Sequence, residues 1–125
     1  MSLGDQITVE QGLLKKLGYC VGADAPMRKE RCDTLRRVMH IRLQPGWLPE
    51  PYRKEWGEPS SAERLMKLVR VLTALVRNAK HRRGGRMDLA IDQWELDLQW
   101  VKETFYDGKR TFRWPSTDPD APWYW

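Results

Sequence analysis

The strongest pattern of apolar positions lies between Ser61 and Arg83. Apolar residues recur there at intervals of three and four, the spacing of one helical face: Leu65, Leu68, Val69, Leu72, Leu75, Val76 and Ala79. Ser60, followed three residues later by Glu63, forms a capping box, which predicts where the helix begins. The pair Gly84-Gly85 predicts its end. The sequence therefore predicts a long amphipathic helix over about 61–83.

A second amphipathic segment runs from about Met87 to Tyr106. Its apolar residues alternate at spacings of four and three, which is typical of a seam between two helices: Met87, Ile91, Trp94, Leu98, Val101 and Phe105. The short Gly-Gly connection predicts that this helix and the preceding one are antiparallel neighbours. Other apolar residues lie off the seam, so we expect the helix to contact a further element as well: Leu89, Leu96 and Trp100.

Two shorter helices are predicted before this pair. Thr8 and Gln11 form a capping box and Gly18 is a stop signal, which together predict a helix over about 9–17. Pro26 is suited to a first helical turn and predicts a second helix over about 26–41. Four apolar residues of this second helix are expected to face the core: Met27, Leu35, Val38 and Met39.

Proline and glycine divide the rest of the chain. The segment 44–60 contains four prolines and two glycines, which predict an ordered loop with at most one helical turn around 52–56. After Asp107-Gly108 we expect Phe112 and Trp114 to fold back onto the helices. The sequence thus predicts an all-α fold, a small bundle of about four helices with a long antiparallel C-terminal hairpin. Residues 1–115 form a single helical domain in this interpretation, and 116–125 form a mobile aromatic tail.

Composition fits one small domain. The chain has 125 residues and 41% hydrophobic content, enough for one core. It has no run of about 20 apolar residues and no charged start followed by an apolar stretch, so neither a membrane span nor a signal peptide is expected. Two cysteines, Cys20 and Cys32, are too few for a disulfide framework. These features predict a cytoplasmic protein.

Charge is segregated along the chain. The net charge is +5, but 16 Lys and Arg residues and 6 Asp and Glu residues lie between Pro26 and Arg86. The remainder is therefore net acidic. Two interpretations stay open, and both can hold together. Basic and acidic helices can neutralise each other inside the fold, or a basic face can meet phosphate or an acidic protein.

No catalytic or metal site is predicted. Zinc sites place ligands in close pairs, whereas Cys20, Cys32, His40 and His81 are scattered. The sequence contains no nucleophile motif with a neighbouring base, and its Gly-rich pieces lack the Walker lysine pattern. Three carboxylates of the second amphipathic segment are interpreted as a solvated acidic face: Asp92, Glu95 and Asp97. We expect no cofactor and no enzymatic activity.

Two clusters of basic residues suggest a nucleic-acid partner. The first lies on the helix predicted over 26–41: Arg28, Lys29, Arg36 and Arg37. The second lies at the end of the longest helix: Arg77, Lys80, Arg82, Arg83 and Arg86. Lys and Arg clusters supply most of the non-specific affinity for DNA or RNA. The alternative interpretation of the second cluster is compensation of the helix dipole together with pairing to the acidic helix. We therefore expect an accessory binding module for nucleic acid or an acidic partner.

Large aromatic residues outside the predicted helices suggest a second hypothesis. They are expected to anchor another chain or a second copy of this one: Trp47, Tyr52, Trp56, Trp123 and Trp125. Aromatic anchors dominate many protein interfaces. The same residues could instead cover the core. A protein-interaction or assembly module is therefore the alternative function.

Several short runs resemble a pattern found in uncharacterised bacterial proteins, some of them in gene neighbourhoods of anti-phage defence or mobile elements. These runs span most of the chain: 17–22, 55–59, 77–80, 94–102 and 112–115. The resemblance implies a DNA-related or accessory role. It implies no activity, cofactor or catalytic residue.

Overall fold

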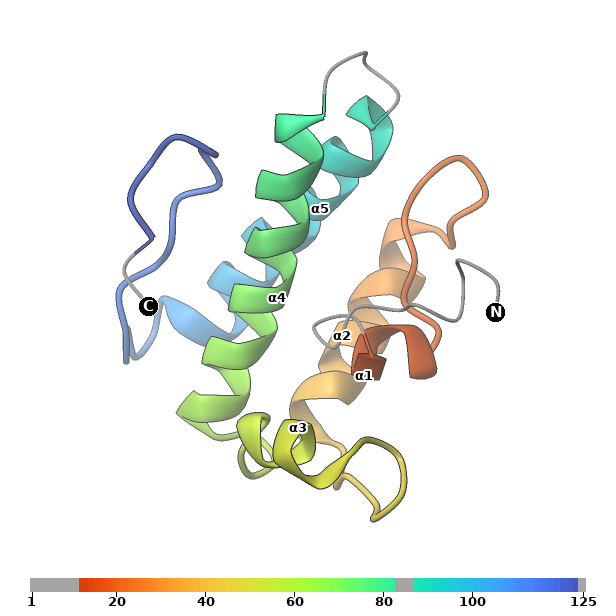
Figure 1. Cartoon of the computed structure of the whole chain (residues 1–125), viewed down its shortest axis with the longest axis vertical. Helices are drawn as coiled ribbons and strands as arrows, with labels where there is room; N and C mark the ends of the chain where they lie inside the picture. The colour runs from red at the N-terminus through yellow and green to blue at the C-terminus, as the bar shows by residue number, and fades with distance from the viewer. Residues whose placement is uncertain (1–11, 83–86, 124–125) are drawn as a thin grey trace.

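The computed structural model describes residues 12–82 and 87–123 and shows an all-α protein in this part of the chain (Figure 1). The predicted all-helical class is confirmed. The described residues form five α-helices, the last of which continues as a π-helical turn, η3: α1 Gly12–Lys16, α2 Arg28–His40, α3 Glu50–Glu55, α4 Ala62–His81, α5 Asp88–Val101 and η3 Lys102–Tyr106.

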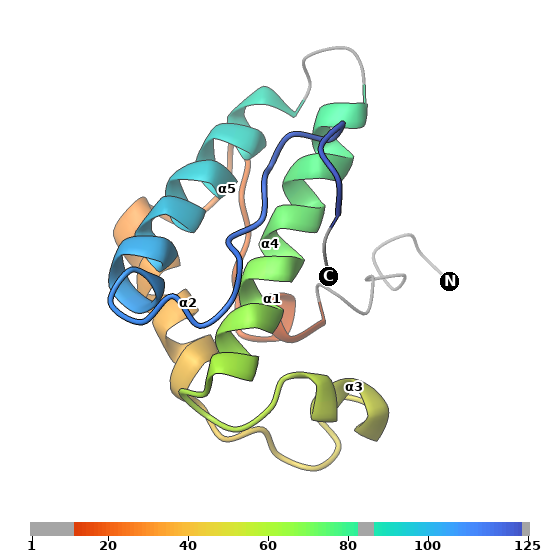
Figure 2. The same cartoon turned by 90° about the vertical axis from the view of Figure 1, so that its left-hand side faces the viewer.

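Helix α4 is the central element. It lies between α2 on one side and the C-terminal segment on the other, and α5 packs against it (Figures 1 and 2). Its apolar stripe is buried, as in Leu68, Leu72 and Val76, which have no exposed surface. The helix cap is Ser61 rather than the predicted Ser60, because Ser61 Oγ accepts a 3.0 Å hydrogen bond from the Arg64 backbone amide.

Helix α5 runs back along α4 and buries Trp94, Leu98 and Val101. Its α-helical part ends at Val101 and the π-helical turn η3 continues to Tyr106, so the predicted extent is helical but its last turn has π geometry. The prediction that this helix contacts a further element is confirmed, because α5 packs against α2. Trp100 takes part in that contact, since Arg36 of α2 lies 5.2 Å from the centroid of its ring. Leu89 and Leu96 are 50% and 48% exposed.

Helix α2 begins at Arg28, and Pro26 precedes the helix instead of occupying its first turn. Met27 caps the helix and is 74% exposed, so the prediction that it faces the core is wrong. A capping residue lies outside the helical repeat, and its side chain need not follow the buried stripe. Leu35 and Val38 are fully buried. In the first predicted helix, α1 starts at Gly12, and Val9 to Gln11 lie outside the described residues.

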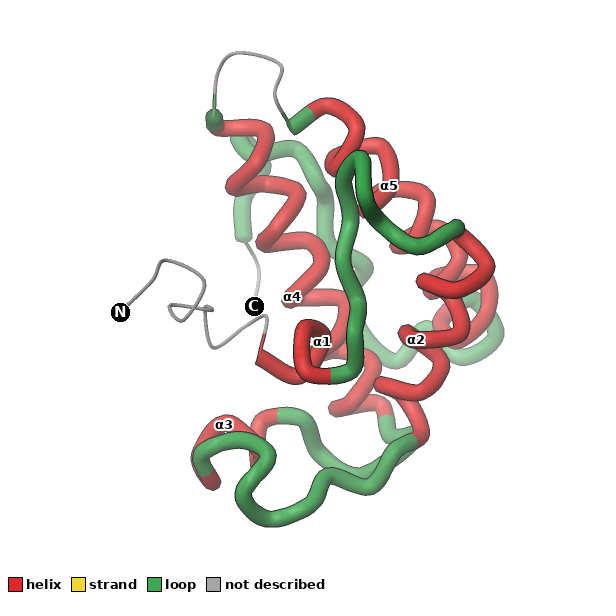
Figure 3. Tube along the Cα trace, turned by 90° about the vertical axis from the view of Figure 1, so that its right-hand side faces the viewer, coloured by secondary structure: helices red, strands yellow, loops and turns green. Residues whose placement is uncertain are grey.

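The loop between α2 and α4 crosses the N-terminal end of α4 and carries the short helix α3 (Figure 3). Arg64, which is 1% exposed, fixes this loop with its guanidinium group. Arg64 Nε donates to the Trp56 carbonyl at 2.8 Å, and Nη2 donates to the Gly57 carbonyl at 3.0 Å. Arg64 Nη1 donates to the carbonyls of Val38 and Ile41 at 2.8 and 2.9 Å. One side chain of α4 therefore holds the end of α2 and the end of α3.

We predict that Arg64→Met lowers the free energy of unfolding by about 2 to 5 kcal/mol, because it leaves buried carbonyl groups without donors. Arg64→Lys should be intermediate, since an ammonium group cannot reach four carbonyls in a planar fork. Urea unfolding followed by circular dichroism measures both. Arg70→Met is the control, because Arg70 is exposed on the same helix. Equal stabilities of Arg64→Met and Arg70→Met would contradict this account of the loop.

Candidate functional site

Twelve of the basic residues that the structure describes fall into two groups. One group is bound inside the fold by carbonyls or carboxylates: Arg31, Arg64, Lys67, Arg77 and Lys80. The other group is exposed: Arg28, Lys29, Arg36, Arg37, Arg42, Arg70 and Arg82. Of these two groups, the exposed one can offer its charge to an external ligand without first breaking an ion pair within the described residues.

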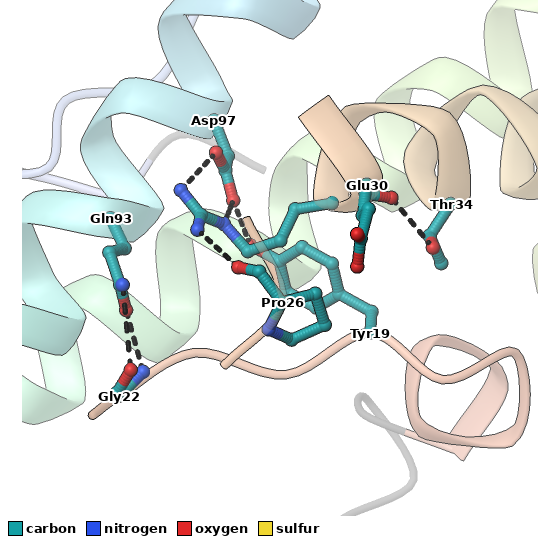
Figure 4. Close-up of polar contacts among 8 residues, drawn as sticks. Tyr19, Gly22, Pro26, Glu30, Thr34, Gln93 and Asp97 are labelled. Atoms are coloured by element: carbon teal, nitrogen blue, oxygen red, sulfur yellow. Dashed lines mark hydrogen bonds and ion pairs between the residues drawn. The ribbon is translucent and has the colours of Figure 1, made fainter. Parts of the chain in front are cut away.

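Asp97 is the centre of a buried polar cluster (Figure 4). It has no exposed surface and accepts hydrogen bonds from two segments far away in the sequence. Tyr19 Oη donates to Asp97 Oδ2 at 2.7 Å. Arg31 donates through Nε to Oδ2 at 2.8 Å and through Nη2 to Oδ1 at 3.1 Å, and its Nη1 donates to the Pro26 carbonyl at 3.0 Å. The interpretation of Asp97 as part of a solvated acidic face is therefore wrong.

The sequence contains an indication that Asp97 is buried. It follows Trp94 by three residues and precedes Val101 by four, so it lies on the apolar seam of α5. A carboxylate at such a position must be paired, because burying an unpaired charge is costly. The partner could not be identified from the sequence, since Arg31 is 66 residues away.

Burial changes the titration of the groups in this cluster. Burial is the main reason why the pKa of Tyr19 is raised well above 10.0, and the neighbouring Asp97 carboxylate adds to the effect. The hydrogen bond to Asp97 raises the pKa of Arg31, and burial raises the pKa of the Cys32 thiol. Arg31 therefore stays charged and Tyr19 stays protonated. The cluster fixes the position of α2 relative to α5.

A second link joins the segment before α2 to α5. Gly22 N donates to Gln93 Oε1 at 2.6 Å, and Gln93 Nε2 returns a 3.5 Å bond to the Gly22 carbonyl (Figure 4). Gly22 has a φ of 112°, which favours glycine at this position. The segment before α2 is thus fixed to α5 at two points, and this sets which face of α2 is turned outward.

Arg77, predicted as a nucleic-acid contact, is bound by the C-terminal segment. Its guanidinium group donates to the carbonyls of Ser116, Pro119 and Ala121, the first two at 3.2 Å. It also lies over the Trp123 ring, 4.8 Å from the centroid. Figure 2 shows this segment running along α4. Arg77 is therefore engaged inside the fold, and its contact with nucleic acid stays a prediction. The mobility of 116–125 stays a prediction.

Lys80 is engaged in a similar way. Lys80 Nζ donates to Glu95 Oε1 at 2.7 Å and to Thr117 Oγ1 at 3.3 Å. This bond from Lys80 is the main reason why the pKa of Glu95 is lowered. Among the described residues, Lys80–Glu95 is the ion pair that joins α4 to α5. Of the remaining predicted contacts in this cluster, Arg82 is exposed, and Arg83 and Arg86 lie outside the described residues.

The predicted basic residues of α2 have a different environment. Arg28, Lys29, Arg36 and Arg37 are all exposed, and within residues 12–82 and 87–123 none forms an ion pair. Arg36 lies over the Trp100 ring at 5.2 Å, which orients its guanidinium group. Two exposed carboxylates lie on the same helix, Glu30 and Asp33. The outer face of α2, defined by the four basic residues, is therefore available to an anion.

The predicted aromatic anchors are separated by the fold. Trp56 is fully buried and belongs to the core, so its prediction as an anchor is wrong. Trp47 is half-buried and packs against the core. Tyr52 and Trp123, which are 36% and 37% exposed, line one groove along α4. Trp125 lies outside the described residues.

The described part of the chain has neither a metal-binding cluster nor a membrane-spanning helix. No group of three or more His, Cys, Asp or Glu residues there could hold a metal ion. Cys20 is exposed and Cys32 is buried, and both thiols are free. None of the helices in this part combines the length and apolar character needed to cross a membrane.

We predict that Tyr19→Phe costs about 1 to 3 kcal/mol near neutral pH, because Asp97 loses a buried donor. The difference should shrink as pH rises. An unfolded tyrosine ionises near pH 10.0, whereas folded Tyr19 keeps its proton because its pKa is raised. The stabilisation from Tyr19 is therefore complete below the unfolded pKa and is lost above it, by about 1.4 kcal/mol per pH unit.

Urea unfolding of both proteins between about pH 8 and pH 11 measures this difference. Tyrosine absorbance of the wild-type protein and of Tyr19→Phe over the same range should differ by a phenol that ionises only on unfolding. A constant difference between the two proteins across the range would contradict the assigned role of Tyr19.

Comparisons with known proteins do not assign a function to this chain. No protein family, no curated protein and no solved structure matches the chain. The resemblance to uncharacterised bacterial proteins stays a prediction. The function has to be argued from the side chains that the fold leaves available.

Proposed function

We propose that the protein is an accessory module that binds nucleic acid through the outer face of α2. The observation that carries this proposal is the contrast between two basic clusters. Arg77 and Lys80 near the end of α4 are held by the C-terminal segment and by α5, whereas Arg28, Lys29, Arg36 and Arg37 are exposed without ion pairs in the described structure.

The spacing of these four side chains suits a phosphate backbone. They form two pairs, Arg28 with Lys29 and Arg36 with Arg37, eight residues apart. A helix rises 1.5 Å per residue, so the pairs are separated by about 12 Å along the axis. That distance corresponds to about three or four phosphates along one strand of a duplex. Each pair can therefore contact a different phosphate.

Two acidic residues of α2 limit how its outer face can contact a nucleic acid. Glu30 and Asp33 lie between the two basic pairs, so the face is positive at both ends and mixed in the middle. Such a face contacts phosphates at two points and does not form a continuous basic strip. Phosphate contacts give affinity and orientation but carry no base sequence directly. We expect binding that depends strongly on salt and weakly on sequence.

The alternative function, a protein-interaction module with aromatic anchors, has less support. Trp56 belongs to the core, and Trp47 packs against it. Tyr52 and Trp123 retain exposed rings, but cationic side chains line the same groove. The exposed cations outnumber the exposed aromatic anchors, which favours a phosphate ligand.

The test is fluorescence anisotropy of labelled duplex DNA, single-stranded DNA and RNA over a salt series. We predict that Lys29→Glu with Arg37→Glu weakens binding by at least about tenfold at low salt. The slope of log affinity against log salt should also fall by about one for each phosphate that the variant no longer neutralises. These two residues are chosen because their side chains are exposed. Lys16→Glu with Lys54→Glu makes the same change in net charge at exposed sites on α1 and α3.

The expected result is that the variant in α2 loses affinity and the control keeps most of it. Equal losses would show that net charge alone governs binding and would overturn the assignment to α2. Absence of binding by the wild-type protein at low salt, or binding that ignores salt, would overturn the nucleic-acid function itself.

A further inference from the structure

We propose that the groove along α4 is a second binding site, for a short single strand of nucleic acid that stacks a base on Tyr52. This proposal shares a ligand class with the proposed function but does not rest on the α2 face. No residue of α2 lines the groove. Either site can therefore fail without the other.

The groove has the size and shape of a ligand site. Its volume is about 570 Å³, within the usual range of about 300 to 1,000 Å³ for small-molecule sites. Part of its lining has one residue at every fourth position along α4 and its C-cap: Arg70, Ala74 and Asn78 of the helix, then the capping residue Arg82. The small Ala74 leaves space between the larger side chains. Tyr52 of α3 and Trp123 of the C-terminal segment also line the groove.

The two arginines of this lining supply the charge. Arg70 and Arg82 are exposed and form no ion pair within the described residues. A third cation of the lining, Lys67, is neutralised by Glu55 at 2.8 Å. The groove therefore keeps two positive charges for an anion. Glu55 is the acidic residue of the lining, and its pairing with Lys67 reduces its repulsion of a phosphate.

The distance between the arginines favours a strand over a single nucleotide. Their backbone positions are twelve residues apart, from the middle of α4 to the residue that caps it, which is about 18 Å along the axis at 1.5 Å per residue. One nucleotide can reach only one of them. A strand of several nucleotides can contact both, and Asn78 lies between them with an amide that can pair with a base edge.

Aromatic rings on the lining provide stacking surfaces. The Tyr52 ring is exposed and makes no ring or cation contact with another described residue. The Trp123 ring is held by Arg77, which is itself held by three carbonyls of the C-terminal segment. Proteins that bind single strands combine such rings with cations along a groove. Tyr52 is therefore assigned as the stacking residue, and Trp123 as a fixed wall.

The test uses the full chain and a labelled oligothymidine of about eight nucleotides, a length within the usual site size for a single strand. We expect Tyr52→Leu and Arg70→Gln each to weaken binding by about tenfold. Tyr52→Phe should restore most of the affinity, because it keeps the ring. Arg42→Gln is the matched control, since Arg42 is exposed and lies outside the groove. Circular dichroism confirms that each variant is folded.

Additional measurements distinguish the groove site from the α2 face, from a site for a single nucleotide or phosphate, and from a protein interface. Binding that disappears with Lys29→Glu and Arg37→Glu but is unchanged in the groove variants would overturn the groove and leave the proposed function intact. Weaker binding in the groove variants but not in the α2 variant would support the groove alone. Adenosine monophosphate or inorganic phosphate competing as well as the oligonucleotide would overturn the assignment to a strand. A wild-type dimer whose mass falls to that of a monomer on Tyr52→Leu would overturn the site in favour of a protein interface.

Discussion

The buried contact between Arg31 and Asp97 determines which surfaces the rest of the molecule can offer. Arg31 joins α2 to α5, and Tyr19 brings the segment before α2 to the same carboxylate. A buried ion pair adds little net stability relative to an apolar contact, but it allows few alternative arrangements. With Arg31 turned inward, Lys29 and Arg37 are left on the opposite, exposed side of α2. Because Arg31 faces the core, the other basic side chains of α2 lie on its exposed side and form the candidate interface.

The same logic applies to α4, whose cations connect the surrounding segments. Arg64 binds carbonyls at the ends of α2 and α3, and Arg77 binds carbonyls of the C-terminal segment. Guanidinium groups suit this task because several donors in a rigid plane can satisfy several acceptors at once. Burial lowers the pKa of Arg64, which reflects the cost of removing its charge from water. The carbonyl hydrogen bonds offset that cost. Several basic residues in the middle of the chain therefore hold segments of the fold together.

The sequence predicted the all-helical class and the extent of α4, because a twenty-residue apolar stripe at helical spacing has few other solutions. It did not predict the burial of Trp56, because proline and glycine around it indicate a loop without saying what the loop covers. Asp97 shows the same limit. Its position on the seam was visible, but its partners lie 66 and 78 residues away. Arg77 and Arg82 look equivalent in the sequence. Only the path of the C-terminal segment distinguishes them.

The path of the C-terminal segment also determines which cations of this region remain available at the groove. The C-terminal segment engages Arg77 and Lys80, which stay partly exposed but are hydrogen-bonded within the fold. It also places Trp123 beside a groove whose remaining cations are Arg70 and Arg82. Exposed charges act on one another over about 8 Å at physiological salt. The arginines of the groove, about 18 Å apart along α4, therefore act as two separate contacts and not as one intense patch. Among the described residues, the fold thus places Arg70 and Arg82 as separate cations in a groove that aromatic rings also line, which is the arrangement on which the proposed strand site rests.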